Sequence, residues 1–300
     1  MSMVLITGSY QVLHDRPDGD TVHFLPQDPG FWFDVPGRNR VDRDEHGGAS
    51  LRLDAIDALE THYKGVGPDF AHQPLGLGAH AARNELLKWL GFTDVVQDDT
   101  EKVTASTPAA VPGYILTGGA DVFHRCVALV GRGDAPSVGD PPKPARSGFR
   151  LDVTVDMLHD TVNHHLLSRG LVYPTFYQSL PDLLRADLTA TARQARTAMA
   201  PDSVWLHDVT TSGAKIENLE SITEDLVMLP KLFRRLVDYI RLFGPGLGCL
   251  PAFLAGGADE FTLPEQPKPP TVGLQHVVEV TNGGTLRMTR PIEDLLFTEK

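Results

Sequence analysis

The sequence predicts an α+β fold, in which a small five-stranded barrel packs against three helices and a smaller α+β part follows. The expected elements through residue 200 run in the order strands, helix, strands, helix and helix, which suits a barrel covered by helices. With 41% hydrophobic and 22% charged residues, the composition is that of a globular protein. The character of the sequence changes after residue 205, so we expect a first domain, 1–205, and a C-terminal extension, 206–300.

Three strands are expected in the first 60 residues. Residues 3–14 and 20–26 predict two of them, and the turn-forming "RPDGD" lies between them. Residues 26–48 carry several prolines and glycines and predict a long irregular insertion. The stretch "LRLDAIDALE", 51–60, predicts a third strand that ends in acidic residues, and a loop through Gln73 follows it.

A helix and the remaining strands follow. The segment "PLGLGAHAARNELLKWLGF" begins with a proline, ends near Gly91 and has apolar residues on one face, which predicts an amphipathic helix. Further strands are expected at 101–109 and 124–131, separated by "GYILTGGADVF", with a second insertion at about 93–113. A Gly- and Pro-rich linker at about 131–148 then leads to two helices, 154–170 and 179–200.

The C-terminal extension has elements of its own. "LPKLFRRLVDYIRLF" predicts a helix, and "HVVEVTNGGTLRMT" predicts a hairpin because "TNGGT" separates two alternating runs. A Gly/Pro segment, 244–257, and a linker, 263–271, lie between them. The helix carries four cations that either form a basic face or point to solvent while the apolar side docks on the barrel, and we favour the second interpretation: Lys231, Arg234, Arg235 and Arg241. The extension is also a candidate surface for a protein partner.

Charge and the absence of targeting signals limit the classes of function. The formal net charge is −12 and neither part of the chain is basic, which excludes a general polyanion-binding module. Nucleic acid would therefore need a local basic patch, or a metal ion that offsets the acids. The N-terminus lacks a secretory signal, no run is long and apolar enough for a membrane span, and the two cysteines match no disulfide or metal pattern. We expect a cytoplasmic protein without membrane contact.

Three separated pieces carry the chemistry. They are "PDGDTVHF", "LRLDAIDALE" and "ADVFHRCVALV". The first two contribute acidic residues, and the third contributes an arginine at the start of a strand. Cleavage of a phosphodiester needs charge neutralised on the phosphate, a positioned water, and a group that takes its proton. Carboxylates with a carbonyl oxygen suit a hard cation such as Ca²⁺, and arginine offers a planar fork of donors to phosphate.

In this order and at these intervals, the pieces resemble the staphylococcal nuclease (thermonuclease) family. The matching text is "DGDTV", "RLDAIDALE", "GLGAHAARNELL" and "DVFHR". The similarity continues through "VNHHLLSRGLVYPTFYQSL" and "SVW", and it covers roughly residues 8–205. The resemblance implies an OB-fold barrel whose open end holds a Ca²⁺-dependent phosphodiesterase site, with Mg²⁺ or Mn²⁺ as alternative cations.

The resemblance also implies roles for individual residues. Asp20 and Asp57 would ligate the cation, the backbone carbonyl of Ala58 would be a third ligand, and Asp18 would lie behind them. Glu60 would be the general base on the attacking water. Two arginines would hold the phosphate: Arg52 and Arg125.

Several positions depart from the family pattern. Ala58 replaces a threonine, which is sufficient if only the carbonyl is a ligand, and Leu59 replaces a proline that would fix Glu60. His124 replaces a glycine, so either Arg125 is presented differently or His124 itself touches substrate. Val122 replaces a basic residue. These losses predict weak non-specific binding of substrate.

Other side chains have two interpretations each. His62, Tyr63 and Lys64 follow Glu60 and are either accessory substrate contacts or a solvated loop. Tyr173 and Tyr177 lie where the family's loop stacks on or hydrogen-bonds to nucleotide, and packing under a loop is the alternative. Asp160 and His164 would share a helical face as metal ligands, but surface polar residues are the favoured interpretation.

The sequence therefore predicts a metal-dependent endonuclease acting on DNA, with RNA as an open alternative. A different hypothesis is a barrel that binds nucleic acid or protein without catalysis. A third is a nuclease effector regulated by its C-terminal part. The third would fail if residues 1–205 alone cut with the rate and preference of the full chain.

Overall fold

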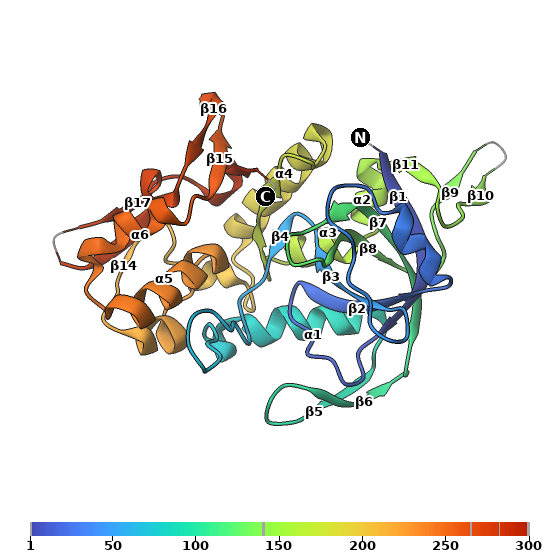
Figure 1. Cartoon of the computed structure of the whole chain (residues 1–300), viewed down its shortest axis with the longest axis horizontal. Helices are drawn as coiled ribbons and strands as arrows, with labels where there is room; N and C mark the ends of the chain where they lie inside the picture. Colours follow the sequence, from blue (N-terminus) through green and yellow to red (C-terminus); the bar gives the residue numbers. More distant parts are fainter. Residues whose placement is uncertain (1, 140–141, 265, 282, 299–300) are drawn as a thin grey trace.

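The computed structural model describes residues 2–139, 142–264, 266–281 and 283–298. Five strands close into a barrel, as the sequence predicted, and Figure 1 shows it beside the C-terminal part. In order around the barrel they are β1 (Ser2–Gln11), β2 (Thr21–Pro26), β3 (Ala49–Leu53), β8 (Cys126–Arg132) and β7 (Val111–Ala120). β7 pairs back with β1, and only β3 and β8 are parallel among these pairs. This arrangement is consistent with an OB-like barrel within a mixed α+β fold.

β7 is a barrel strand, although the sequence indicated only a connector at 113–123. Its Gly113 lies under the Tyr10 ring, where an added Cβ would be 2.4 Å from a ring carbon. A Cβ added at Gly131 of β8 would similarly lie 2.1 Å from a ring carbon of Tyr114. The Tyr10 hydroxyl donates to the carbonyls of Tyr114 and Gly131 at 2.6 and 2.8 Å. These glycines make room for buried rings inside the barrel, which explains why a glycine-rich segment is a strand.

Two predicted strands differ from the structure. The strand expected at 101–109 is β6 (Val103–Thr107), which pairs with β5 (Asp94–Gln97) in a separate two-stranded sheet. The strand expected at 51–60 is broken, because β3 ends at Leu53 and β4 (Ile56–Asp57) starts after a turn. Ala55 adopts a φ of +66° in that turn.

The helices cover the barrel as expected, but one of them is divided. α1 (Ala79–Leu90) and α4 (Asp182–Ala198) correspond to the first and third predicted helices. The second is two helices, α2 (Val155–His159) and α3 (Val162–Ser168). Thr161 starts α3, since its side chain accepts a hydrogen bond from the His164 amide, and a threonine in this role begins a new helix.

α3 is fixed to the barrel through a buried amide. The side chain of Asn163 accepts a hydrogen bond from the Val130 amide at 2.9 Å and donates to the carbonyls of Asp54 and Ala128 at 2.9 and 3.0 Å. Asp54 lies in the turn between β3 and β4, so this contact joins the helix layer to the end of the barrel.

The remaining strands are short. They are β9 (Ser137–Val138), β10 (Lys143–Pro144), β11 (Arg150–Asp152), β12 (Tyr173–Pro174), β13 (Phe176–Tyr177) and β14 (Ala214–Lys215). β11 extends the barrel sheet at β1, and β12 pairs with β4 so that Tyr173 lies opposite Asp57. β9 and β10 occupy part of the expected linker, of which residues 140–141 lie outside the described residues.

The C-terminal part contains the predicted helix, α5 (Pro230–Phe243), and the predicted hairpin. Its other elements are α6 (Leu250–Gly256), β15 (Glu260–Leu263), β16 (Gln266–Val272), β17 (Val278–Val280), β18 (Thr285–Met288) and β19 (Leu296–Phe297). α6 forms in the expected Gly/Pro segment and β16 in the expected linker, so both expectations were wrong. Pairing of β16 with β15 outweighs the low strand preference of its prolines.

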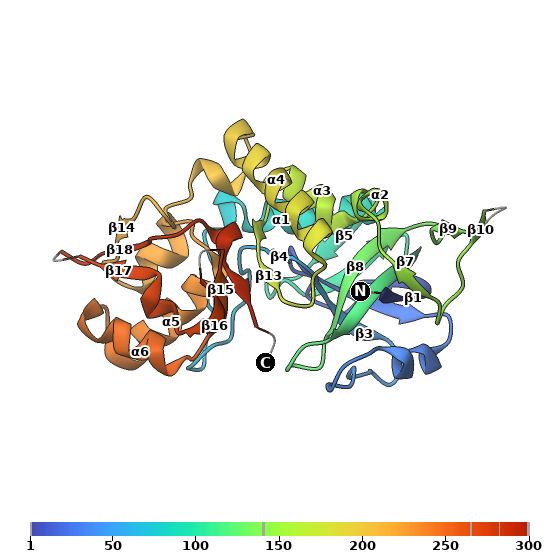
Figure 2. The ribbon, with the colours of Figure 1, turned by 90° about the horizontal axis from the view of Figure 1, so that it is seen from above.

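Two apolar clusters form the core. One fills the barrel and the space beneath the helices that cover it. The other centres on α5, yet it also contains Leu59, Ala79 and Tyr173 from the first two-thirds of the chain. In addition, β13 pairs with β19, so a strand of the first domain and strands of the C-terminal part lie in one sheet, and Figure 2 shows β13 beside β15 and β16. The C-terminal part is therefore packed directly against the end of the barrel. Within the described ranges, no helix combines the length and apolar character needed to cross a membrane.

Candidate active site

A tight turn brings Arg52 and Asp57 together. The positive φ of Ala55 reverses the chain after β3, which returns Ile56 and Asp57 past the Arg52 side chain. One guanidinium nitrogen of Arg52 donates to the carbonyl of Ile56 at 3.1 Å and to Asp57 Oδ1 at 2.5 Å. Asp57 is fully buried, and a buried carboxylate needs such a partner.

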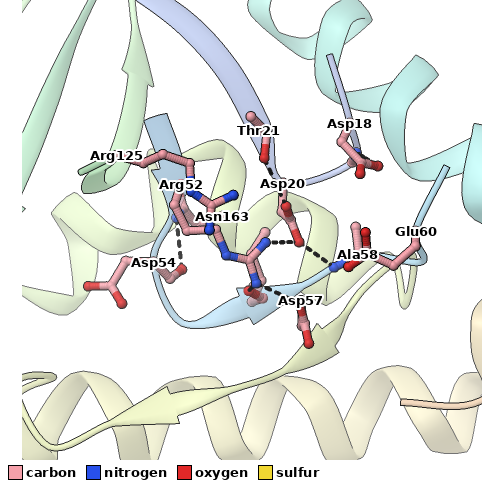
Figure 3. Close-up of polar contacts among 12 residues, drawn as sticks. Asp18, Asp20, Thr21, Arg52, Asp54, Asp57, Ala58, Glu60, Arg125 and Asn163 are labelled. Atoms are coloured by element: carbon pink, nitrogen blue, oxygen red, sulfur yellow. Dashed lines mark hydrogen bonds and ion pairs between the residues drawn. The ribbon is translucent and has the colours of Figure 1, made fainter. Parts of the chain in front are cut away.

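Asp20 reaches the same place from the preceding turn. Its carboxylate accepts a hydrogen bond from the Ala58 amide at 2.7 Å and pairs with Arg52 (Figure 3). Gly19 permits this approach, because a Cβ there would lie 2.6 Å from that of Ala58 and 2.7 Å from that of Ala82. The "DGD" turn is therefore packed between α1 and the 57–60 segment.

Glu60 lies at the edge of this group and connects it to the C-terminal part. Its amide donates to the Gln73 side chain at 3.2 Å, and the amide nitrogen of Gln73 donates to the carbonyl of Met228 at 2.7 Å. Gln73 is fully buried. This link fixes the backbone of Glu60 although Leu59 replaces the family's proline.

Arg234 of α5 joins the same group, which the sequence did not predict. Its guanidinium pairs with the Glu60 carboxylate and donates to Asp57 Oδ2 at 3.0 Å. The side chain is only 27% exposed, so the expectation that the cations of this helix face solvent was wrong for Arg234. It was also wrong for Arg235, which binds Asp259 at 2.8 Å. Arg234 lies next to the apolar face of α5. The expected docking of that face on the barrel was the only indication in the sequence that Arg234 comes close to the site.

Negative charge exceeds positive charge in this group, which we call the carboxylate cluster: Asp18, Asp20, Arg52, Asp57, Glu60 and Arg234. Burial raises the pKa of Asp18, and the charges of Asp20 and Glu60 raise it further. Burial also raises the pKa of Glu60, with Arg234 opposing it and Asp57 and Asp20 adding to it. Burial would raise the pKa of Asp57 as well, but Arg234 and Arg52 outweigh it and hold the pKa below its ordinary value.

The carboxylate cluster offers oxygen ligands of the kind that a hard divalent cation takes. Four carboxylates meet two guanidinium groups in the carboxylate cluster, so unbalanced negative charge remains, and this charge adds to burial in raising the pKa values of Asp18 and Glu60. Asp20 and Asp57 with the Ala58 carbonyl would hold the cation, since oxygen ligands of this kind suit Ca²⁺. A cation bound to Asp57 would compete with Arg52 and Arg234 for its oxygens.

Arg125 lies beside this cluster on the outer face of the barrel. It directly precedes β8, whose Cys126 pairs with Leu51, so Arg125 comes next to Ser50 and near Arg52 (Figure 3). Its guanidinium pairs with Asp121 at 2.8 Å. His124 adopts a φ of +63°, which keeps the backbone that glycine would give, and its ring contacts the Arg40 carbonyl at 2.9 Å.

A cavity of about 390 Å³ adjoins Arg125. Its lining includes His23, Arg43, Asp44, Phe123, His124 and Arg125. His23 is two residues from Thr21, which pairs with Arg52, so the cavity and Arg52 share one face of the sheet. Phe123 is 73% exposed beneath the Arg125 guanidinium.

The loop after Glu60 contacts α5. The hydroxyl of Tyr63 donates to Asp238 at 2.8 Å, and its ring packs edge-on against Phe233. Lys64 donates to the carbonyl of Pro68, and His62 contacts the hydroxyl of its neighbour Thr61 at 2.7 Å. The hydroxyl of Tyr63 is therefore engaged by Asp238 and links the loop to the C-terminal part.

The two tyrosines after α3 lie in different surroundings. Tyr173 is fully buried, packs against Trp205, and donates from its hydroxyl to Asp208 at 2.8 Å. Tyr177 is half-buried against Phe297 and lies close enough to Arg52 to affect its pKa. Only Tyr177 has a surface that a ligand could reach.

The sequence was also compared with protein-family models and with curated proteins, and it matches none of them.

Proposed function

We propose that this protein is a metal-dependent phosphodiesterase of the staphylococcal nuclease type, cutting DNA with RNA as a further candidate substrate. The observation that carries the proposal is the convergence of three sequence-distant segments. Arg52 pairs with both Asp20 and Asp57, and Glu60 joins them through Arg234. The order and spacing of Asp20, Arg52, Asp57 and Glu60 match the family's motif, and their chemistry suits phosphate.

The roles follow from position. A Ca²⁺ ion held by Asp20, Asp57 and the Ala58 carbonyl would supply positive charge and a coordination position for a phosphate oxygen. Glu60 takes a proton from water as the water oxygen bonds to phosphorus and the bond to the leaving oxygen breaks. Burial raises the pKa of Glu60, which makes its carboxylate a stronger base.

The arginines hold the phosphate and the base. Arg52 and Arg125 lie on one face of the sheet and offer donors to the non-bridging oxygens. Arg125 would exchange its contact with Asp121 for this role. Arg234 binds the Glu60 carboxylate through one oxygen, Oε1, and so orients the other toward the water.

The cavity beside Arg125 suits a nucleotide neighbouring the scissile phosphate. Phe123 offers an exposed ring on which a base can stack, and Arg43 and His124 offer donors nearby. Tyr177 lies on the other flank of Arg52 as a second candidate contact. Tyr63 and Tyr173 are not part of this surface, because their hydroxyls are bonded to Asp238 and Asp208 respectively.

One observation favours the alternative of a binding module without catalysis. Glu60 is paired with Arg234, and Arg125 is paired with Asp121, so both need to rearrange before they could act. The same pairing is compatible with a nuclease effector whose C-terminal part regulates the site. α5 is anchored by buried residues on both sides of Arg234, which favours a built-in residue over a removable inhibitor.

The experiment that tests the proposal is cleavage of single-stranded DNA, duplex DNA and RNA by the full chain with Ca²⁺, Mg²⁺ or EDTA. We expect cleavage of at least one substrate with a cation and none with EDTA. Absence of cleavage under every cation, together with binding of the same oligonucleotides, would leave the binding module as the function. Cleavage that persists in EDTA would contradict the metal requirement.

A further inference from the structure

A second group of metal-ligating side chains lies where α2, α3 and α4 meet. His159 is the last residue of α2, His164 lies in the first turn of α3, and Asp187 lies in α4. One ligand atom from each lies within 4.8 Å of the others. None of the three belongs to the carboxylate cluster.

The break between α2 and α3 creates this arrangement. In one continuous helix, positions 159 and 164 would point about 140° apart, because each residue turns the helix by about 100°. Here the chain bends at Asp160 and Thr161, and the two imidazole rings stack with centroids 4.0 Å apart and planes at 25°. Asp187 closes the group, with its Oδ2 2.8 Å from His159 Nε2.

The surroundings leave room for a ligand. His164 Nε2 has a long contact of 3.4 Å with the Thr191 hydroxyl, one turn after Asp187 on α4. His159 is 44% exposed, whereas His164 and Asp187 are partly buried, so one side of the group opens to solvent. Two imidazoles and one carboxylate, with an open fourth position, form the donor set that Zn²⁺ takes in proteins.

We propose that His159, His164 and Asp187 bind one Zn²⁺ ion, with water as the fourth ligand, and that this ion clamps α2 and α3 to α4. The segment between α3 and α4 contains β12, in which Tyr173 pairs with Asp57. The ion would therefore link the helices on both sides of β12, the strand that pairs with Asp57. It stabilises the fold and supplies no chemistry to the reaction.

Zinc titration of the full-length protein, after removal of metals with EDTA, tests this site. We expect binding of one Zn²⁺ per chain by calorimetry, with a dissociation constant of about 1 μM or below. At a hundredfold excess of free zinc over that constant, the unfolding temperature should rise by about 5 °C. No stoichiometric binding at about 100 μM zinc would overturn the proposal.

Variants separate this site from other zinc-binding groups. H159A removes an exposed ligand and H164A a partly buried one, and each should weaken zinc binding at least about a hundredfold. H207Q, at an exposed histidine outside the group, should bind zinc as the wild type does. Zinc binding that is unchanged in H159A and H164A would overturn the assignment. Loss of zinc binding in D57N would instead place the ion in the carboxylate cluster, and cleavage activity enters none of these readouts.

Discussion

The guanidinium of Arg234 lies 3.0 Å from the carboxylate of Asp57, although 177 positions separate the two residues in the chain. It also pairs with Glu60, so a helix of the C-terminal part completes a group built at the end of the barrel. The neighbouring Asp238 fastens Tyr63 at 2.8 Å, which holds α5 against the loop that follows Glu60. The C-terminal part is thus a structural component of the candidate active site.

Replacing Arg234 with methionine should have two opposite effects. Loss of a positive charge beside Asp57 should tighten Ca²⁺ binding by about tenfold or more. Loss of the donor to Glu60 should lower kcat by about ten- to a hundredfold, because a hydrogen bond to a charged group contributes about 1.5–3 kcal/mol. Calcium titration and single-turnover cleavage measure these effects. R287M removes an exposed arginine from a surface pair and is the matched control. An increase in kcat for R234M would show instead that Arg234 restrains the site.

Truncation after residue 205 should destabilise the barrel. The second apolar cluster includes Leu59, Ala79 and Tyr173, and removal of α5 would expose all three. Since burial of one large apolar side chain contributes about 1.5–3 kcal/mol, we expect a loss of about 5 kcal/mol or failure to fold. Urea unfolding of the fragment and the full chain measures the difference. A fragment 1–205 with the stability and cleavage rate of the full chain would refute this view of the C-terminal part.

Stability should depend on pH through Glu101. Burial acts to raise its pKa, but the hydrogen bond with His80 and the charge of Arg83 hold the pKa below its ordinary value of 4.5. Because the folded pKa is lowered, the stabilisation is present above the unfolded value and is lost as pH falls through the folded value. E101Q should therefore cost about 0.5–1.5 kcal/mol at pH 7.

The difference between wild type and E101Q should shrink as pH falls through the lowered folded pKa of Glu101, and it should disappear once that side chain is protonated. Urea unfolding across this range checks the sign. E45Q, at an exposed glutamate, is the control. A difference that grows on acidification below pH 4 would contradict the assignment of Glu101.

Phe123 should contribute to substrate affinity. Its exposed ring lines the cavity beside Arg125, and stacking of a base on an aromatic ring contributes about 1–3 kcal/mol. F123A should raise KM for a single-stranded oligonucleotide by about fivefold or more and leave kcat nearly unchanged. L183A removes an equally exposed apolar side chain on α4 and should change neither constant. An unchanged KM in F123A would exclude the cavity as a base-binding surface.

The sequence predicted those parts of the fold that depend on local pattern. Two apolar runs separated by the turn-forming "RPDGD" predicted β1 and β2, and the residues of α5 predicted its helix. The sequence did not predict β7, because a glycine such as Gly113 usually indicates a turn. Only the structure shows that Gly113 makes room for the ring of Tyr10. The sequence did not predict the β15–β16 pair. The prolines of β16 disfavour a strand, and the pairing that outweighs them cannot be recognised from one segment alone.

The candidate site shows the same limit. Motif spacing indicated Asp20, Arg52, Asp57 and Glu60, which the structure brings together. It gave no sign of Arg234, because a contact across 174 positions depends on how α5 docks. The broken strand after Leu53 was also missed, since Ala55 in a left-handed turn is unusual for a residue with a Cβ.

The most direct test of the account is the single-turnover rate of single-stranded DNA cleavage at saturating Ca²⁺ for wild type, E60Q and E45Q. E60Q keeps the shape of the side chain but cannot take a proton, whereas E45Q changes an exposed glutamate away from the carboxylate cluster. The account predicts cleavage by wild type and E45Q at equal rates, and a loss of about a hundredfold or more in E60Q with oligonucleotide binding retained. Equal rates for E60Q and wild type would contradict the assignment of Glu60 as the base, and with it the proposed active site.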